Sequence, residues 1–257
     1  MKWLRFTHQG RTAFGVLDGE QVAVHSGDLF GESKATGERV AVAELEWLTP
    51  TVPGKMIGLW NNFHAAAEKN GWATPAEPLY FLKAASSLCA HGQPIRTPAS
   101  YDGRVIYEGE LAVVIGRTAT AVSVEEAPSC IFGYSCANDV TAMELLNRDP
   151  SFPQWTRAKG FDTFGVFGPV VDTDFDPAQG EVVVLLNGRE RQRYPLADMI
   201  FPPAQLVSMI SQDMTLHPGD VILCGTSLGV LPMKPGMRVE VVIDGIGTLA
   251  NDYVKLP

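Results

Sequence analysis

The sequence predicts a β-rich fold of the α+β class, and two observations predict it. Strand-like apolar runs recur along the chain, at residues 55–59, 105–116, 131–137, 165–171, 181–186, 220–224 and 238–243. Helical spacing is scarcer, and the segments that fit a helix are short and followed by Gly, Pro or polar residues: 64–70, 141–147 and 203–211. Many strands with a few short helices are typical of an α+β domain.

The first part of the chain predicts a small β meander. Polar and apolar residues alternate around Gly10 and Gly19, as in short strands joined by tight turns. A stretch rich in Pro, Thr and Gly at residues 49–54 then interrupts regular structure. We therefore expect a small N-terminal β region at residues 1–54 and a main domain at residues 55–257.

Composition narrows the classes of protein and of partner. The chain has 257 residues, 46% of them hydrophobic, which is enough to bury a full core. No apolar run approaches the ~20 residues that cross a bilayer, and the first residues lack the apolar core of a signal peptide, so we expect a cytoplasmic protein with no membrane partner. A net charge of −9 without a Lys/Arg block argues against nucleic acid, and four cysteines without Cys-x-x-Cys spacing argue against a disulfide framework.

Three carboxylates form the main candidate site. In the apolar run at residues 105–116, the two-residue period of a strand places Glu108 and Glu110 on the same face. Like charges side by side repel unless they face solvent or share a cation. Asp139 ends a second strand-like segment about one hairpin further on, so the three groups could converge.

Oxygen ligands without His or Cys favour Mg²⁺ or Mn²⁺, with Ca²⁺ as a further candidate, over zinc. Few protein ligands leave positions for water and substrate, which favours catalysis. The alternative is that Glu108 and Glu110 lie on an ordinary solvated strand edge.

A short helix at residues 64–70 could carry a general base. Asn61 and Asn62 suit its N-cap, and Gly71 suits its end. His64 and Glu68 are four residues apart on one face, so the carboxylate could orient the imidazole for proton transfer. A surface ion pair is the alternative.

Lys159 and a glycine-bracketed loop are further candidates for contact with substrate. Lys159 precedes an apolar run and could hold a substrate carboxylate or enolate oxygen by a charge-assisted hydrogen bond. Gly225 and Thr226 follow a buried strand, where backbone N–H groups and the hydroxyl could reach a carboxylate. A plain tight turn is the alternative for this loop.

Taken in order, the segments 81–83, 107–111, 133–139, 159–165, 218–220 and 225–226 resemble the fumarylacetoacetate hydrolase family, over residues 55–254. The resemblance implies a mixed β-roll, usually in a homodimer, with one Mg²⁺ or Mn²⁺ held by Glu108, Glu110 and Asp139. It also implies that Lys83, Lys159 and Thr226 bind substrate, and that Lys159 takes part in catalysis. His64 and Glu68 resemble the catalytic dyad of the family's lid helix.

The sequence departs from the family pattern in two places. Many members carry the dyad glutamate three residues after the histidine, whereas Ala67 stands there and Glu68 follows. Many members carry an Arg and a Gln after the metal-binding aspartate, and Met143 and Leu146 stand at those positions. Loss of a cation and an amide there implies that the distal end of the substrate is bound differently.

These residues support three hypotheses about function. The first is metal-dependent hydrolysis of a C–C bond in a 2,4-dioxo acid of the acylpyruvate or fumarylpyruvate type, with His64 activating water. The second keeps the metal and the small 2-oxo acid but gives decarboxylation, isomerisation or hydration in the breakdown of aromatic compounds. The third is a non-catalytic binding protein with the same fold.

Overall fold

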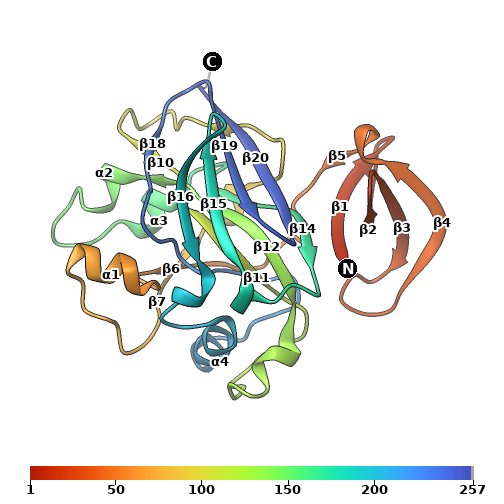
Figure 1. The fold of residues 1–257 in the computed structure, drawn as a ribbon, viewed down its shortest axis with the longest axis horizontal. Coiled ribbons are helices and arrows are strands. Elements are labelled where there is room, and N and C mark those ends of the chain that lie inside the picture. Colours follow the sequence, from red (N-terminus) through yellow and green to blue (C-terminus); the bar gives the residue numbers. More distant parts are fainter. Residues whose placement is uncertain (256–257) are drawn as a thin grey trace.

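A large mixed sheet of twelve strands runs through the molecule (Figure 1). The structure is a computed structural model that describes residues 1–255. The strands of this sheet are β1 (Lys2–His8), β2 (Arg11–Asp18), β3 (Gln21–Gly27), β4 (Ser33–Ala41), β5 (Glu46–Trp47), β6 (Met56–Trp60), β7 (Leu79–Lys83), β8 (Leu88–Cys89), β11 (Gly109–Ile115), β12 (Ile131–Asp139), β14 (Gly165–Asp172) and β17 (Val221–Leu223). Their order is β4-β3-β2-β1-β14-β12-β11-β17-β6-β7, with β5 paired to β1 and β8 to β14.

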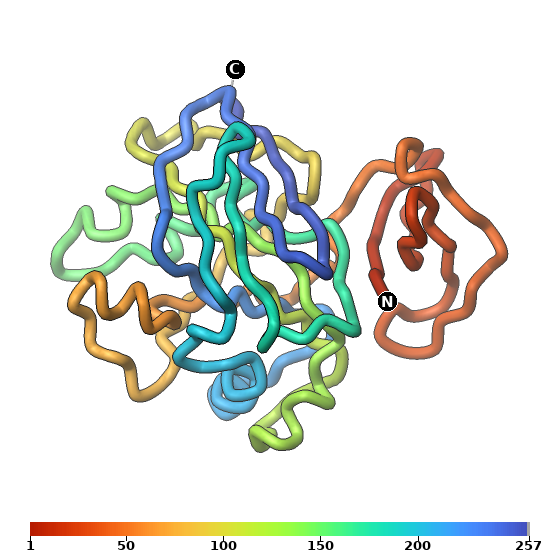
Figure 2. Tube along the Cα trace, in the orientation of Figure 1, coloured from red at the N-terminus to blue at the C-terminus, as the bar shows by residue number. Residues whose placement is uncertain are grey.

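The N-terminal strands stand to one side of the main body, as the tube in Figure 2 shows. They form the predicted meander, in which β1 to β4 pair in sequence. β1 also joins the main body, because Lys2 pairs with Asp172 and Trp3 with Val171 of β14. The boundary that we predict near residue 54 falls between β5 and β6, and the division of the chain into two domains stays a prediction.

A five-stranded sheet packs against the centre of the large one. It has the order β16 (Arg189–Pro195), β15 (Glu181–Leu186), β19 (Met237–Ile243), β20 (Gly247–Val254) and β9 (Ile95–Arg96). In Figure 1, β19 and β20 lie in front of the strands of the large sheet, and both strands contact β12.

Strand β11 is buried on both faces. Leu111 and Val113 belong to the main apolar cluster, whereas Ala112 and Val114 belong to a second cluster on the opposite face. A strand covered on both faces needs a continuous apolar run, which is the pattern that the sequence shows here. Water is therefore excluded from both sides of the strand that carries Glu110, one of the predicted metal ligands.

The helices are few and short, which confirms the β-rich α+β class. They are α1 (His64–Asn70), α2 (Met143–Leu146), α3 (Trp155–Lys159) and α4 (Pro203–Asp213), with single 3₁₀ turns at Val42–Glu44, Ala85–Ser87, Ala127–Cys130, Pro177–Gln179 and Leu196–Asp198. Within residues 1–255, no helix is long and apolar enough to cross a bilayer. The predicted bounds of two of the three helices agree with the structure, because α1 has the expected bounds and α4 ends two residues later than predicted.

A three-stranded sheet alters one predicted strand and one predicted helix. It consists of β10 (Val105–Ile106), β13 (Thr141–Ala142) and β18 (Pro232–Met233). The strand predicted over residues 105–116 is interrupted at Tyr107 and Glu108, because β10 pairs with β13 and β18 whereas β11 pairs with β12 and β17. The helix predicted from residue 141 begins only at Met143, because the two residues before it form β13.

The predicted N-cap of α1 is wrong. Phe63 is the N-cap residue and gives no side-chain hydrogen bond; Asp198 instead accepts from the Ala65 N–H at 3.0 Å. Asn62 bonds the backbone of Phe201 and Cys224, and Asn61 donates to the carbonyl of Ala73 at 3.0 Å. At the other end, Gly71 adopts the left-handed conformation (φ 67°) that was expected of it.

A buried carboxylate ties the start of β17 to β6. Asp220 accepts hydrogen bonds from the backbone N–H groups of Lys55 and His217, both at 2.8 Å, and pairs with the Lys55 ammonium at 2.5 Å. Its side chain is 1% exposed, and that of Lys55 is 23% exposed. The buried charge of Asp220 is stabilised only while these hydrogen-bond donors and the Lys55 ammonium remain in place.

We expect Asp220→Asn to lower the free energy of unfolding by about 2 to 3 kcal/mol, because it removes one partner of a largely buried ion pair. Urea-induced unfolding followed by circular dichroism measures the change. Asp18→Asn is the matched control, because it breaks the exposed pair of Asp18 with Arg39 and should leave the midpoint unchanged. Equal midpoints for both variants would contradict the structural role of Asp220.

Candidate metal centre

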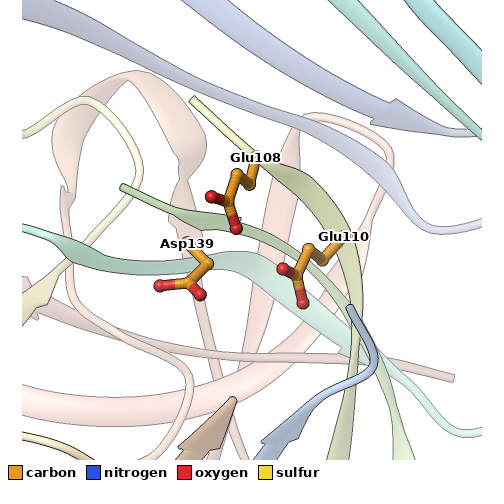
Figure 3. A group of neighbouring side chains, drawn as sticks. All are labelled: Glu108, Glu110 and Asp139. Carbon is orange, nitrogen blue, oxygen red and sulfur yellow. The ribbon is translucent and has the colours of Figure 1, made fainter. Parts of the chain in front are cut away.

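Three carboxylates meet where β11 and β12 pair. Glu110 is the second residue of β11, Asp139 ends β12, and Glu108 immediately precedes β11. The Asp139 N–H donates to the Glu108 carbonyl at 2.9 Å, so the antiparallel alignment continues past the end of the ladder. Figure 3 shows the three side chains around a common space, and one oxygen from each lies within 4.8 Å of the others.

Gly109, which lies between the two glutamates, is where the covering sheet closely approaches the backbone of the site. Its carbonyl accepts from the Tyr194 hydroxyl at 2.5 Å and from the Thr226 hydroxyl at 2.9 Å. A Cβ atom on Gly109 would lie 2.2 Å from Cγ2 of Val184 in the covering sheet. Only glycine therefore allows the two sheets to approach this closely at the site.

Two lysine ammonium groups contact the carboxylates. Lys83 Nζ lies 2.5 Å from Oδ1 of Asp139. Lys159 Nζ lies 2.6 Å from Oδ2 of Asp139 and 2.6 Å from Oε2 of Glu108. The Lys83 side chain is fully buried and the Lys159 side chain is 3% exposed.

Burial and charge affect the three carboxyl groups differently. Burial alone would raise the pKa of Asp139, but the ammonium groups of Lys159 and Lys83 hold that pKa below its ordinary value. Burial, followed by the charges of Asp139 and Glu108, raises the pKa of Glu110 well above its ordinary value. The pKa of Glu108 is also raised, chiefly by burial, against the opposing effect of Lys159. Glu110 is therefore the least compensated of the three.

The hydrogen bonding of Glu110 leaves one of its carboxylate oxygens available to a cation. Its Oε2 accepts from the Gly225 N–H at 2.7 Å, while its Oε1 is buried with no hydrogen-bond partner among the described residues. Gly225 has φ +87°, a conformation that directs this N–H toward Glu110 at no steric cost. A buried oxygen without a partner, beside two further carboxylates, suits a hard divalent cation that takes oxygen ligands.

A cavity of about 860 Å³ opens beside the carboxylates. Glu108, Lys159, Thr141 and Thr226 line it at this end, and Glu108 is held by a hydrogen bond of 2.9 Å from the Thr141 hydroxyl. Glu108 and Lys159 are the only charged residues among the described residues that line the cavity. A small acid could therefore enter with its polar end toward the carboxylates and Lys159.

A larger cleft, of about 1140 Å³, lies between the N-terminal strands and the segment that follows β14. None of the predicted site residues lines this cleft, which contains Asp172, Asp174 and Asp176 without a neighbouring buried polar cluster. Of these two spaces, the smaller cavity is the candidate active site, because it joins space for a ligand to the converging carboxylates and Lys159.

Of the other predicted site residues, one lines the cavity and three do not. Thr226 lines the cavity and accepts a hydrogen bond of 2.8 Å from Gln192. Lys83 does not line it and contacts Asp139 from within the core. His64 and Glu68 are exposed on α1, and no ion pair or hydrogen bond joins them within residues 1–255. The same helix contributes Ala66 and Asn70 to the cavity wall.

The sequence analysis missed the aromatic wall of the cavity. Trp60, Trp72, Phe81 and Trp155 line it and come from segments almost a hundred residues apart. No spacing in the sequence links Trp155 to the other three, so only the packing of α3 against β7 reveals the wall. Met143 and Leu146, noted as departures from the family pattern, also line the cavity.

The fold and the carboxylate cluster together define a class of β-rich enzymes with a possible metal site. Residues 55–254 match the family described as Fumarylacetoacetate (FAA) hydrolase C-terminal, and residues 1–50 match Rv2993c-like, N-terminal. The chain belongs to the fumarylacetoacetate hydrolase family, as the sequence motifs predicted.

Three similar proteins illustrate the relatives of this chain, and two of them are named for an activity. Protein Rv2993c of Mycobacterium tuberculosis is 38% identical, over 95% of this chain and 94% of its own length. The mitochondrial oxaloacetate tautomerase FAHD1 of Arabidopsis thaliana is 39% identical, over 78% and 91%. The crystal structure of 5-carboxymethyl-2-hydroxymuconate delta-isomerase from Mycobacterium smegmatis is 36% identical, covers all of both chains and has a TM-score of 0.91.

We expect Mn²⁺ to stabilise the chelator-stripped protein and Glu110→Gln to abolish this effect, because the amide removes an anionic ligand. A cation at 100 times its dissociation constant adds about 2.7 kcal/mol to the stability of the folded state. For a chain of this size, that corresponds to a rise in Tm of roughly 5 to 10 °C. Differential scanning calorimetry measures the rise, and isothermal titration calorimetry measures the affinity.

Glu125→Gln is the control, because Glu125 is an exposed carboxylate outside the cluster. The variant should keep the full rise in Tm. Mn²⁺ affinity in Glu110→Gln equal to that of the wild type would remove Glu110 from the set of ligands.

Proposed function

We propose that this chain is a divalent-metal-dependent enzyme that interconverts isomers of a small 2-oxo acid, with exchange between the keto and enol forms as the reaction that the site supports best. One observation carries the choice. Among the described residues that line the cavity, the only charged groups are Glu108 and Lys159, and no histidine stands there to activate water. An isomerisation consumes no water, so it needs a group that carries a proton but none that activates a water molecule.

The chemistry of the site fits this reaction. Bound to Glu108, Glu110 and Asp139, Mg²⁺ or Mn²⁺ would supply positive charge beside the 2-oxo group of the substrate. Lys159, already within 2.6 Å of two of the carboxylates, would donate a hydrogen bond to a substrate oxygen that gains negative charge. In the enol-to-keto direction, the Lys159 ammonium would give a proton to the carbon adjacent to the 2-oxo group, and the resulting amine would take the proton of the enol hydroxyl. The atoms then balance without water, and Lys159 ends as an ammonium again.

The remaining residues orient the acid. Thr226 stands at the edge of the cavity with its hydroxyl held between Gly109 and Gln192. Lys83 acts as a positioning residue, because its ammonium fixes Asp139 from the buried side. The low exposure of Lys159 strengthens its hydrogen bonds, because there is little water to compete for them.

The names of two of these relatives support isomerisation. A tautomerase that is 39% identical and an isomerase that is 36% identical both act without a net gain of water. The homodimer that the family resemblance implies stays a prediction, which light scattering coupled to gel filtration would test.

Hydrolysis of a C–C bond in a 2,4-dioxo acid is the second candidate. It is supported by the family description, which names a hydrolase, and by α1, which carries His64 and also lines the cavity through Ala66 and Asn70. A movement of this helix would be needed to bring His64 to a water molecule beside the substrate. His64 and Glu68 therefore have a catalytic role only under this second candidate.

We expect loss of enol absorbance from a 2-oxo acid to require added Mn²⁺ or Mg²⁺ after chelation, and His64→Ala to keep that activity within about twofold. If water attack is the reaction instead, removal of a general base should lower the rate by roughly 10² or more. Ultraviolet absorbance follows the enol, and a coupled assay for pyruvate detects cleavage of an acylpyruvate. Metal-dependent release of pyruvate, abolished by His64→Ala, would replace isomerisation with hydrolysis.

A further inference from the structure

The cavity is charged at its inner end and uncharged, with much apolar surface, toward its mouth. Lys159 and Glu108 at the inner end have side chains that are 3% and 14% exposed. Trp72, Met143 and Leu228, which also line the cavity, are 40%, 41% and 42% exposed. The charge is thus confined to the deepest part, and the outer part offers apolar surface together with the exposed, uncharged amides of Asn70 and Asn147.

One wall is a continuous series of aromatic rings. The Lys159 ammonium lies 5.1 Å from the centre of the Phe81 ring, and Phe81 stacks on Trp155 at 5.1 Å with 13° between the planes. Trp155 contacts Trp60 at 6.0 Å, and Trp60 contacts Trp72 at 5.0 Å. The series therefore leads from the ammonium group to the mouth of the cavity without a gap.

The rest of the wall adds no charge. Ile106, Met143, Leu146 and Leu228 line the cavity as well. The described residues of the wall include no Lys or Arg apart from Lys159. A second carboxylate placed along this wall would lose water without gaining a cationic partner, which is costly. An apolar group there would gain favourable burial against rings whose faces suit flat partners.

We infer that the substrate of this site is a 2-oxo monocarboxylic acid with an uncharged, apolar substituent, aromatic or branched alkyl, that lies along the wall formed by Phe81, Trp155, Trp60 and Trp72. This inference rests on the proposed function, because the 2-oxo carboxylate is what the inner end would hold. It separates this chain from enzymes whose substrates carry a charged group at both ends. It also gives a role to Met143, which provides an apolar side chain at the mouth.

Calorimetric titration of the Mn²⁺-loaded protein with pyruvate, phenylpyruvate and oxaloacetate tests the inference without depending on turnover. The three acids share the 2-oxo carboxylate and differ in the group attached to carbon 3, which is hydrogen, phenyl or carboxylate. We expect phenylpyruvate to bind at least about tenfold more tightly than pyruvate, because its ring is buried on the aromatic wall. Oxaloacetate should bind no more tightly than pyruvate.

Two variants locate the effect on the wall. Trp155→Ala should weaken phenylpyruvate roughly fivefold and leave pyruvate unchanged, because Trp155 stacks on Phe81 next to Lys159 and only the phenyl group would extend along these rings. Met143→Arg should strengthen oxaloacetate by roughly tenfold, because it adds the missing cation. Phe152→Ala is the matched control: Phe152 is 66% exposed, does not line the cavity, and should alter none of the three affinities.

The outcomes separate this inference from the proposed function. Oxaloacetate that binds as tightly as phenylpyruvate, or a Trp155→Ala variant with unchanged preference, would overturn the inference and leave a metal-dependent 2-oxo acid enzyme in place. Selective binding of phenylpyruvate without conversion of its enol or keto form would support the inference and overturn the proposed reaction. Failure of all three acids to bind would overturn both.

Discussion

Buried negative charge at the junction of β11 and β12 is the constraint on which the site depends. Three carboxylates face the ammonium groups of Lys83 and Lys159, so one negative charge is left over if all five groups are ionised. That excess falls on Glu110, whose pKa is raised by its burial and by its two acidic neighbours. A divalent cation would outweigh this excess and leave one positive charge for the carboxylate of a substrate, which is why the same arrangement is costly in the protein alone and suited to binding metal.

The fold supplies this arrangement by burying one strand on both faces. β11 lies between β12 and β17 in the large sheet and beneath the five-stranded sheet, so no water reaches its backbone from either side. Gly109 allows the covering sheet to approach, and Tyr194 and Thr226 of the surrounding structure hold its carbonyl. The carboxylates are thus held by rigid elements, as a site that must stabilise developing charge requires.

The cavity joins this charged end to an apolar wall. Because hydrogen bonds and ion pairs are stronger where water is excluded, Lys159 can act on a substrate oxygen from a position in which it is almost fully buried. The aromatic rings from Phe81 to Trp72 extend the same space to the surface. Under the proposed function, chemistry at one end and recognition of the substituent at the other would be divided between different parts of the chain.

The sequence by itself determined the β-rich class, the bounds of α1 and the three carboxylates that converge, because these follow from local periodicity and from motifs that each lie within a few residues. It placed Glu108 and Glu110 on one strand, but the tertiary structure breaks that strand, since β10 and β11 pair in different sheets. Only the tertiary structure decided that Lys83 is buried against Asp139, that His64 and Glu68 are exposed, and that Trp155 joins the wall begun by Trp60 and Trp72. Such contacts depend on how distant segments pack, and no spacing along the chain encodes the distance between side chains that only folding brings together.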